Sequence, residues 1–192
     1  MRFTMLIGVG LLASILAGCG RTDCRNDALL ESAVRNPPRA VTLASSAQRS
    51  ALLDRIKSLA GTWESADEKG QMHVSSIFTV TSNGSAVREV MLPGTPHEMT
   101  NMYTMDGPTL LVTHYCAQGN QPRMRARADG TAPDRIHFAY DGVGNYAGGD
   151  QLYMGDLTII FRDDDHIAAQ WGSYVAGKPA AHNATFELTR RR

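Results

Sequence analysis

The chain has 192 residues with 19 basic and 19 acidic side chains, so its formal net charge is zero. A chain of this length suits one domain with a tail, and the neutral balance argues against nucleic acid as the main partner. Eighteen glycines, together with few long helical patterns, predict a turn-rich and mainly β protein.

The first residues have the pattern of an export signal. A short positive start at residues 1–2 precedes an apolar run at residues 5–17, which is too short to span a bilayer. The run ends in Leu-Ala-Gly-Cys at residues 16–19, which resembles the lipobox of bacterial lipoproteins. The resemblance implies cleavage before Cys19 and lipidation of its thiol, and the acyl chains then hold the protein to a membrane.

The residues after the lipobox complete this expectation. Gly20 follows the cysteine, and in the lipoprotein family this favours the outer membrane, with the protein facing the periplasm. We therefore expect a signal peptide over residues 1–18 and a lipidated tether over 19–44. An oxidising compartment would permit a Cys24–Cys116 disulfide, although nothing in a tether brings the two thiols together.

A helix is predicted just after the tether. The serines at residues 45–46 can cap a helix that runs to about Leu59. Leu52, Ile56 and Leu59 recur with the helical period and form one apolar face. Gly61 then ends the helix in a left-handed conformation.

Strand patterns recur every eight to twelve residues from Met72 onward and predict about nine short antiparallel strands. Turn signals separate several of them, at Asn83-Gly84, Asp106-Gly107 and Asp129-Gly130. One apolar face per strand suits a sheet that closes on itself, which also removes its free edges. The glycine-rich segment 142–155 is predicted to be a loop that can cover the mouth of such a barrel.

Two features resemble known protein families. A helix followed by Gly-Thr-Trp at residues 61–63 and then strands resembles the lipocalin and calycin superfamily, in which the helix and tryptophan close one barrel end. The phrases at residues 93–99, 113–116 and 119–124 resemble those of an uncharacterised bacterial lipocalin-like family. The resemblance implies a fold and no established activity, so we expect residues 45–192 to form a single antiparallel lipocalin-like β-barrel with one N-terminal helix.

Residues 97–124 hold the densest group of polar and reactive side chains. Strand alternation puts His114 and Cys116 on one face and Tyr115 on the other, but both faces are partly apolar, so the inner face stays open. Mostly apolar walls with a few polar groups are typical of a ligand pocket, and Arg123 can meet an acidic head group. We predict that a small apolar or amphipathic ligand contacts His97, Met99, Tyr103, His114, Tyr115, Cys116, Asn120, Arg123 and Met124.

Other chemistries use the same residues. Imidazole and thiolate at His114 and Cys116 suit a metal, but further ligands would have to come from His97 or Glu98. We therefore predict no metal and no resident cofactor, with haem on a single histidine as the open alternative. An enzyme would use Cys116 as its nucleophile. Side chains two apart on a strand lie about 7 Å from each other, so His114 is too far from the Cys116 thiol and His97 would be the base. No hydrolase signature surrounds them, so we expect no catalytic residues; a structural envelope protein with no ligand is the third alternative.

Overall fold

The computed structural model describes residues 39–130 and 132–192, and residues 41–192 form one compact unit. The predicted signal peptide, Cys19, Cys24 and most of the predicted tether lie outside the described residues. Expectations about export, lipidation and the Cys24–Cys116 disulfide therefore stay predictions. Within the described part of the chain, no helix has the length and apolar character needed to cross a membrane.

The predicted N-terminal helix forms as two short helices, α2 (Ser46–Ala51) and α3 (Leu53–Lys57). Ser45 begins α2 with a capping box, because its hydroxyl accepts from the Gln48 amide at 3.2 Å and its own amide donates to the Gln48 side chain at 2.8 Å. Leu52 departs from helical geometry between them. Leu52 and Leu53, which stand at the break, are both buried.

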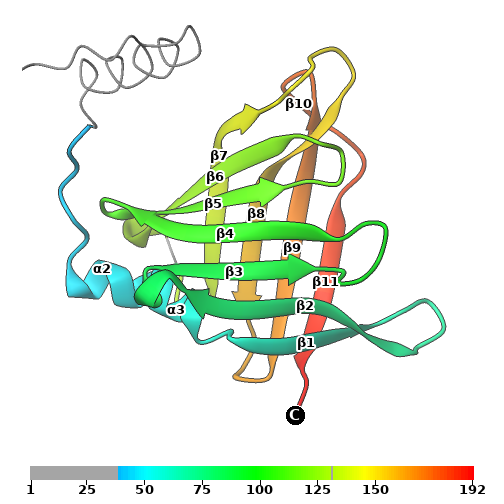
Figure 1. Cartoon of the computed structure of the whole chain (residues 1–192), viewed down its shortest axis with the longest axis horizontal. Helices are drawn as coiled ribbons and strands as arrows, with labels where there is room; N and C mark the ends of the chain where they lie inside the picture. The colour runs from blue at the N-terminus through cyan, green and yellow to red at the C-terminus, as the bar shows by residue number, and fades with distance from the viewer. Residues whose placement is uncertain (1–38, 131) are drawn as a thin grey trace, which may run out of the picture. The chain divides into compact units, whose positions relative to one another are not determined.

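The remaining described chain forms a closed antiparallel barrel of ten strands (Figure 1). An eleventh strand of two residues pairs with the end of β9. The prediction of a single antiparallel barrel is confirmed, with one barrel strand more than the nine expected. Neighbours in sequence pair from β1 to β9, and β11 closes the ring between β9 and β1. The strands are β1 (Gly61–Ala66), β2 (Met72–Thr81), β3 (Ala86–Met91), β4 (Met99–Asp106), β5 (Thr109–Tyr115), β6 (Gln121–Arg127), β7 (Arg135–Gly144), β8 (Leu152–Phe161), β9 (His166–Val175), β10 (Lys178–Pro179) and β11 (Ala184–Arg190).

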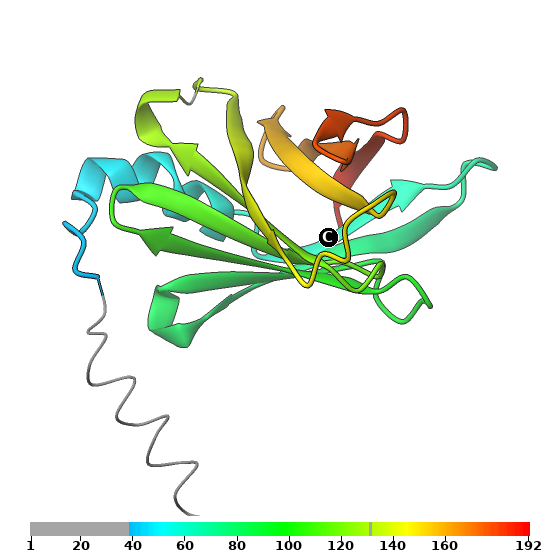
Figure 2. The same cartoon turned by 90° about the horizontal axis from the view of Figure 1, so that it is seen from above.

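Both helices lie at one end of the barrel, which we call the closed end (Figures 1 and 2). There the Trp63 indole is fully buried and donates to the Leu59 carbonyl at 2.7 Å. The Arg190 guanidinium lies 4.4 Å from the centre of the Trp63 rings and donates to the carbonyls of Ser58 and Ala60. These contacts join the first and last barrel strands to the segment that follows α3.

An apolar core fills the barrel next to the closed end. Its aromatic rings follow one another across the interior, from Trp63 to Phe78 at 6.5 Å, to Tyr103 at 6.5 Å and to Phe138 at 5.9 Å between ring centres. Ile56 of α3 is also fully buried within the same core. The strand faces that carry these residues therefore point inward, which settles the face that the sequence left open.

The opposite end, which we call the mouth, is formed by the connections between β1 and β2, β3 and β4, β5 and β6, β7 and β8, and β9 and β11. The β1–β2 hairpin projects beyond its neighbours here (Figures 1 and 2). β1 and β11 pair through only two positions, Trp63 with Arg190 and Glu64 with Thr189. Toward the mouth a hollow of about 770 Å³ lies between these strands, and Met72 and Phe186 are among the residues that line it.

Candidate functional site

Three polar residues form a row across the inner wall of the barrel. Glu89 of β3 pairs with Asn101 of β4, and Asn101 pairs with His114 of β5, so the three side chains lie side by side on one face. Their exposed fractions are 3%, 0% and 1%. We call Glu89, Asn101 and His114 the polar row; it is the main interruption of an otherwise apolar interior.

Glu89 anchors the polar row at one end. Its carboxyl oxygens accept hydrogen bonds from the Ser76 hydroxyl at 2.7 Å, the Asn101 amide nitrogen at 2.7 Å and the Tyr103 hydroxyl at 2.8 Å. Burial raises the pKa of the Glu89 carboxyl, while the three donors act in the opposite direction. Burial, and then the nearby Glu89 charge, raise the pKa of Tyr103 well above its usual value, which keeps its hydroxyl a donor.

The Glu89 contact sets the orientation of every group after it. Because the Asn101 amide nitrogen donates to Glu89, the Asn101 oxygen faces His114, and Oδ1 lies 2.7 Å from Nδ1 of the imidazole. An amide oxygen only accepts, so Nδ1 carries the proton. Burial lowers the pKa of His114 to about 4, and the imidazole is therefore neutral near pH 7. The remaining nitrogen, Nε2, consequently presents an unprotonated lone pair to the interior.

Three buried side-chain atoms of the described residues have no hydrogen-bond partner: Nε2 of His114, Oδ1 of Asn120 and Nε1 of Trp171. Trp171 reaches His114 from β9, with 4.9 Å between the ring centres. Asn120 is fully buried at the mouth, two positions before Pro122 of β6, which is also buried. An unsatisfied buried polar group costs about 1–3 kcal/mol. Each of these two acceptors and one donor therefore favours a polar partner, from a ligand or a water.

Two loops are fastened together over this part of the mouth. Asn120 donates from Nδ2 to the Leu152 carbonyl at 2.9 Å, and Asn145 donates to the Gly119 carbonyl at 2.7 Å. Gln151 adds a longer bond of 3.4 Å to the Gln118 carbonyl. We call these three contacts the mouth latch. The predicted glycine-rich loop is shorter than expected, because β7 runs to Gly144 and β8 begins at Leu152, but residues 145–151 do lie at the mouth.

The nine predicted ligand-binding residues divide between the inside and the outside of the barrel. The structure brings five of them to the interior, where four are fully buried and Met99 is half-buried against the core; the five are Met99, Tyr103, His114, Asn120 and Met124. The other four do not join them. His97 and the Tyr115 side chain are exposed, Arg123 is exposed beside Asp141, and Cys116 is half-buried just beyond the end of β5.

Sequence reasoning missed the residues that organise the site. Ser76, Glu89 and Asn101 were absent from the predicted set, yet Glu89 determines how Asn101 and His114 are oriented. A signal was present at Glu89, because strand alternation places it on the same face as Val87 and Met91. A charged residue on an apolar strand face indicates a buried polar contact.

Metal and cysteine chemistry gain no support from this geometry. Among residues 39–130 and 132–192, no three His, Cys, Asp or Glu side chains are close enough together to hold a metal ion. In the same part of the chain, no hydrogen bond joins the Cys116 thiol to an imidazole. The arrangement instead offers one neutral imidazole with a directed lone pair and a nearby indole donor.

No protein-family model matches the chain, and no curated protein matches its sequence. The fold and site define a closed antiparallel β-barrel with a buried polar row, and the resemblance to a lipocalin-like family stays a prediction.

Proposed function

We propose that the protein binds a small, partly apolar molecule inside the barrel, with a hydrogen-bond donor of that molecule on Nε2 of His114. The observation that carries the proposal is the buried, unpartnered lone pair of His114, which Asn101 and Glu89 hold in place. Burying polar groups costs free energy unless they are well paired. A barrel with a purely structural role would be served better by apolar residues at these positions.

The unpartnered donors and acceptors of the buried side chains indicate the ligand's chemistry. Nε2 of His114 and Oδ1 of Asn120 accept, whereas Nε1 of Trp171 donates. A hydroxyl or a primary amide can both donate and accept hydrogen bonds. An anionic group is disfavoured here, because the neutral imidazole has no charge to offer and Glu89 adds a carboxyl to the same row. The rest of the ligand would contact apolar side chains such as Met124.

Haem is the second candidate, and the same histidine favours it. Histidines that bind metals usually donate their other ring nitrogen to an oxygen, which directs the free nitrogen at the metal. His114 has this arrangement, with Nδ1 on the Asn101 oxygen. Haem bound at Nε2 would take a single protein ligand and supply an iron centre. An intense visible absorbance that depends on His114 would favour haem over a hydroxyl or amide ligand.

The experiment is native mass spectrometry of the full chain purified without denaturant, followed by thermal unfolding with a panel of lipids, small amides and haem. Bound mass that disappears in His114→Phe is the expected result. His137→Phe is the matched control, because His137 is exposed on β7 and contacts Thr158 outside the barrel. An empty wild-type barrel with no thermal shift across the panel would contradict the proposal.

We also infer, from the sequence alone, that the protein is a lipoprotein of the outer membrane facing the periplasm. The support is the order of positive start, apolar run and Leu-Ala-Gly-Cys ending at Cys19. Cys19→Ser should leave an unprocessed precursor of higher mass. Normal processing of that variant would exclude lipidation at this cysteine.

A further inference from the structure

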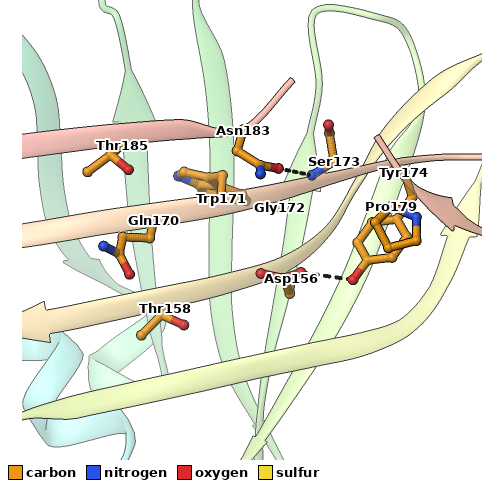
Figure 3. A pocket seen from close by; sticks show the side chains of 10 residues that line it. All are labelled: Asp156, Thr158, Gln170, Trp171, Gly172, Ser173, Tyr174, Pro179, Asn183 and Thr185. Atoms are coloured by element: carbon orange, nitrogen blue, oxygen red, sulfur yellow. Dashed lines mark hydrogen bonds between the residues drawn. The ribbon is translucent and has the colours of Figure 1, made fainter. Parts of the chain in front are cut away.

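A second hollow, of about 360 Å³, lies on the outer surface of the barrel over β8, β9 and the segment that leads into β11 (Figure 3). Three of its side chains come from neighbouring strands in register. Thr158 pairs with Gln170, and Gln170 pairs with Thr185, so the three form one row. Trp171 follows Gln170 and has its ring against His114 inside. The row therefore faces away from the interior site.

Glycines shape the floor of this hollow. Asp156 pairs with Gly172, and its carboxylate leans over the β9 backbone where any β-carbon at residue 172 would collide with it. The Tyr174 ring lies over Gly155 in the same way, and its hydroxyl donates to Asp156 at 3.0 Å. Asp156 is thereby held by a tyrosine at the surface with one oxygen, Oδ1, making no hydrogen bond to the described residues.

The polar wall is rich in unused hydrogen-bonding groups. Within the described residues, the Gln170 side-chain amide, the Thr185 hydroxyl and Nδ2 of Asn183 make no hydrogen bond. Oδ1 of Asn183 accepts from the Ser173 backbone N–H at 3.2 Å. Asp156 is the one Asp, Glu, Lys, Arg or His side chain among the lining residues of this hollow. The hollow thus presents mainly neutral donors and acceptors.

An aromatic surface continues from one side of the hollow. Pro179 pairs with Tyr174 at that side, and the Tyr174 ring stacks on Tyr153 with 6.0 Å between centres. Tyr140 and Tyr146 contact the same Tyr153 ring at 5.6 and 5.3 Å, and half of Tyr140 is exposed. Flat apolar faces therefore stand beside the polar row.

We propose that this outer hollow binds a neutral saccharide, with one pyranose ring against the row of Thr158, Gln170 and Thr185. A sugar ring carries hydroxyls at its edge, which both donate and accept, and C–H groups on its faces, which pack on aromatic rings. Gln170 and Thr185 contact the hydroxyls, and Tyr174 contacts a C–H face. A strongly charged ligand is disfavoured because Asp156 is the sole acidic side chain of the hollow, the hollow has no basic one, and Tyr174 already donates to Asp156.

The test is NMR titration of the isotope-labelled full chain with methyl β-D-glucopyranoside and, separately, N-acetylglucosamine. The expected result is a saturable shift of the Gly172 backbone amide and the Gln170 side-chain amide with at least one of the sugars. Removing both hydrogen-bonding groups in Gln170→Ala/Thr185→Val should weaken binding by about tenfold, given roughly a few-fold loss per hydrogen bond. Thr79→Val, on the exposed face of β2, should bind as the wild type does.

The saccharide site is overturned if neither sugar shifts the Gly172 and Gln170 signals, or if the double variant binds a sugar with the affinity of the wild type. Cyclohexanol serves as a probe with one hydroxyl, and equal shifts from it would likewise exclude sugar recognition. If the double variant fails to fold, Gln170→Ala alone replaces it. His114→Phe should leave sugar binding unchanged, so this site and the interior site can fail independently.

Discussion

The Asn101 side-chain oxygen lies 2.7 Å from Nδ1 of His114, and this single contact decides which imidazole nitrogen is free. Asn101 has no freedom to turn over, because its amide nitrogen is held by Glu89. A carboxyl on one strand therefore controls the lone pair of a histidine two strands away.

Asn101→Leu should destabilise the fold by about 3 kcal/mol, because it leaves Nδ1 of His114 and one Glu89 bond unpaired in the interior. The measurement is urea unfolding at neutral pH. Gln118→Leu, at an exposed loop position, is the control and should change stability by less than about 0.5 kcal/mol. Equal stability of the two variants would mean that the polar row is not paired as described.

His114 should make the protein less stable in mild acid. Its pKa is lowered to about 4 in the folded state from the usual 6.5, so its contribution is complete above pH 6.5 and is lost as pH falls toward 4. At about 1.36 kcal/mol per pH unit, the loss is at most about 3 kcal/mol. Denaturant unfolding across this range, compared between wild type and His114→Phe, should show a shallower acid dependence in the variant. An imidazole NMR titration midpoint near 6.5 would contradict this.

Glu89 should make the protein less stable as pH rises, which is opposite to the effect of His114. Because the pKa of its carboxyl is raised in the folded state, its contribution is complete below the ordinary value of 4.5 and is lost as pH rises through the folded value. Glu89→Gln should remove this dependence and keep the fold, since an amide can retain one acceptor for Asn101 and donate to the Ser76 hydroxyl. Unfolding curves above pH 4.5 test it. A variant with the same pH dependence as the wild type would show that Glu89 is not the group responsible.

Asn120→Ala should loosen the mouth latch and leave the core intact. The change removes the bond to the Leu152 carbonyl, worth about 0.5–1.5 kcal/mol. Hydrogen–deuterium exchange should become faster in residues 145–152 and remain slow in β3 to β5. Gln71→Ala, in the exposed β1–β2 connection, is the control. Unchanged exchange at 145–152 would show that the latch does not restrain the loop.

The barrel was predictable because its strands alternate, and the exceptions have physical causes. β1 was not counted among the alternating strands, since Trp63 is its only fully buried residue. The helix was expected to be continuous because Leu52, Ile56 and Leu59 share one face, but the backbone of Leu52 leaves helical geometry and divides it in two.

The site was only half predictable for a related reason. Met99, Tyr103 and His114 were found from their residue types, but both faces of β4 and β5 are partly apolar, so alternation alone gave no inner face. The inner face follows from the pairing of β3, β4 and β5. That register depends on turn geometry and on packing along the whole sheet, which the sequence of one strand does not show. Glu89 belongs to the site through that register.

The two-position seam between β1 and β11 also has a consequence for how the protein is made. The first strand of the barrel has no partner on that side until the last has been synthesised, so the ring cannot close on a growing chain. Contacts between segments so distant in sequence form slowly. The barrel can therefore close only after β11 has been made, and until then the outer edge of β1 is open to pairing with another chain.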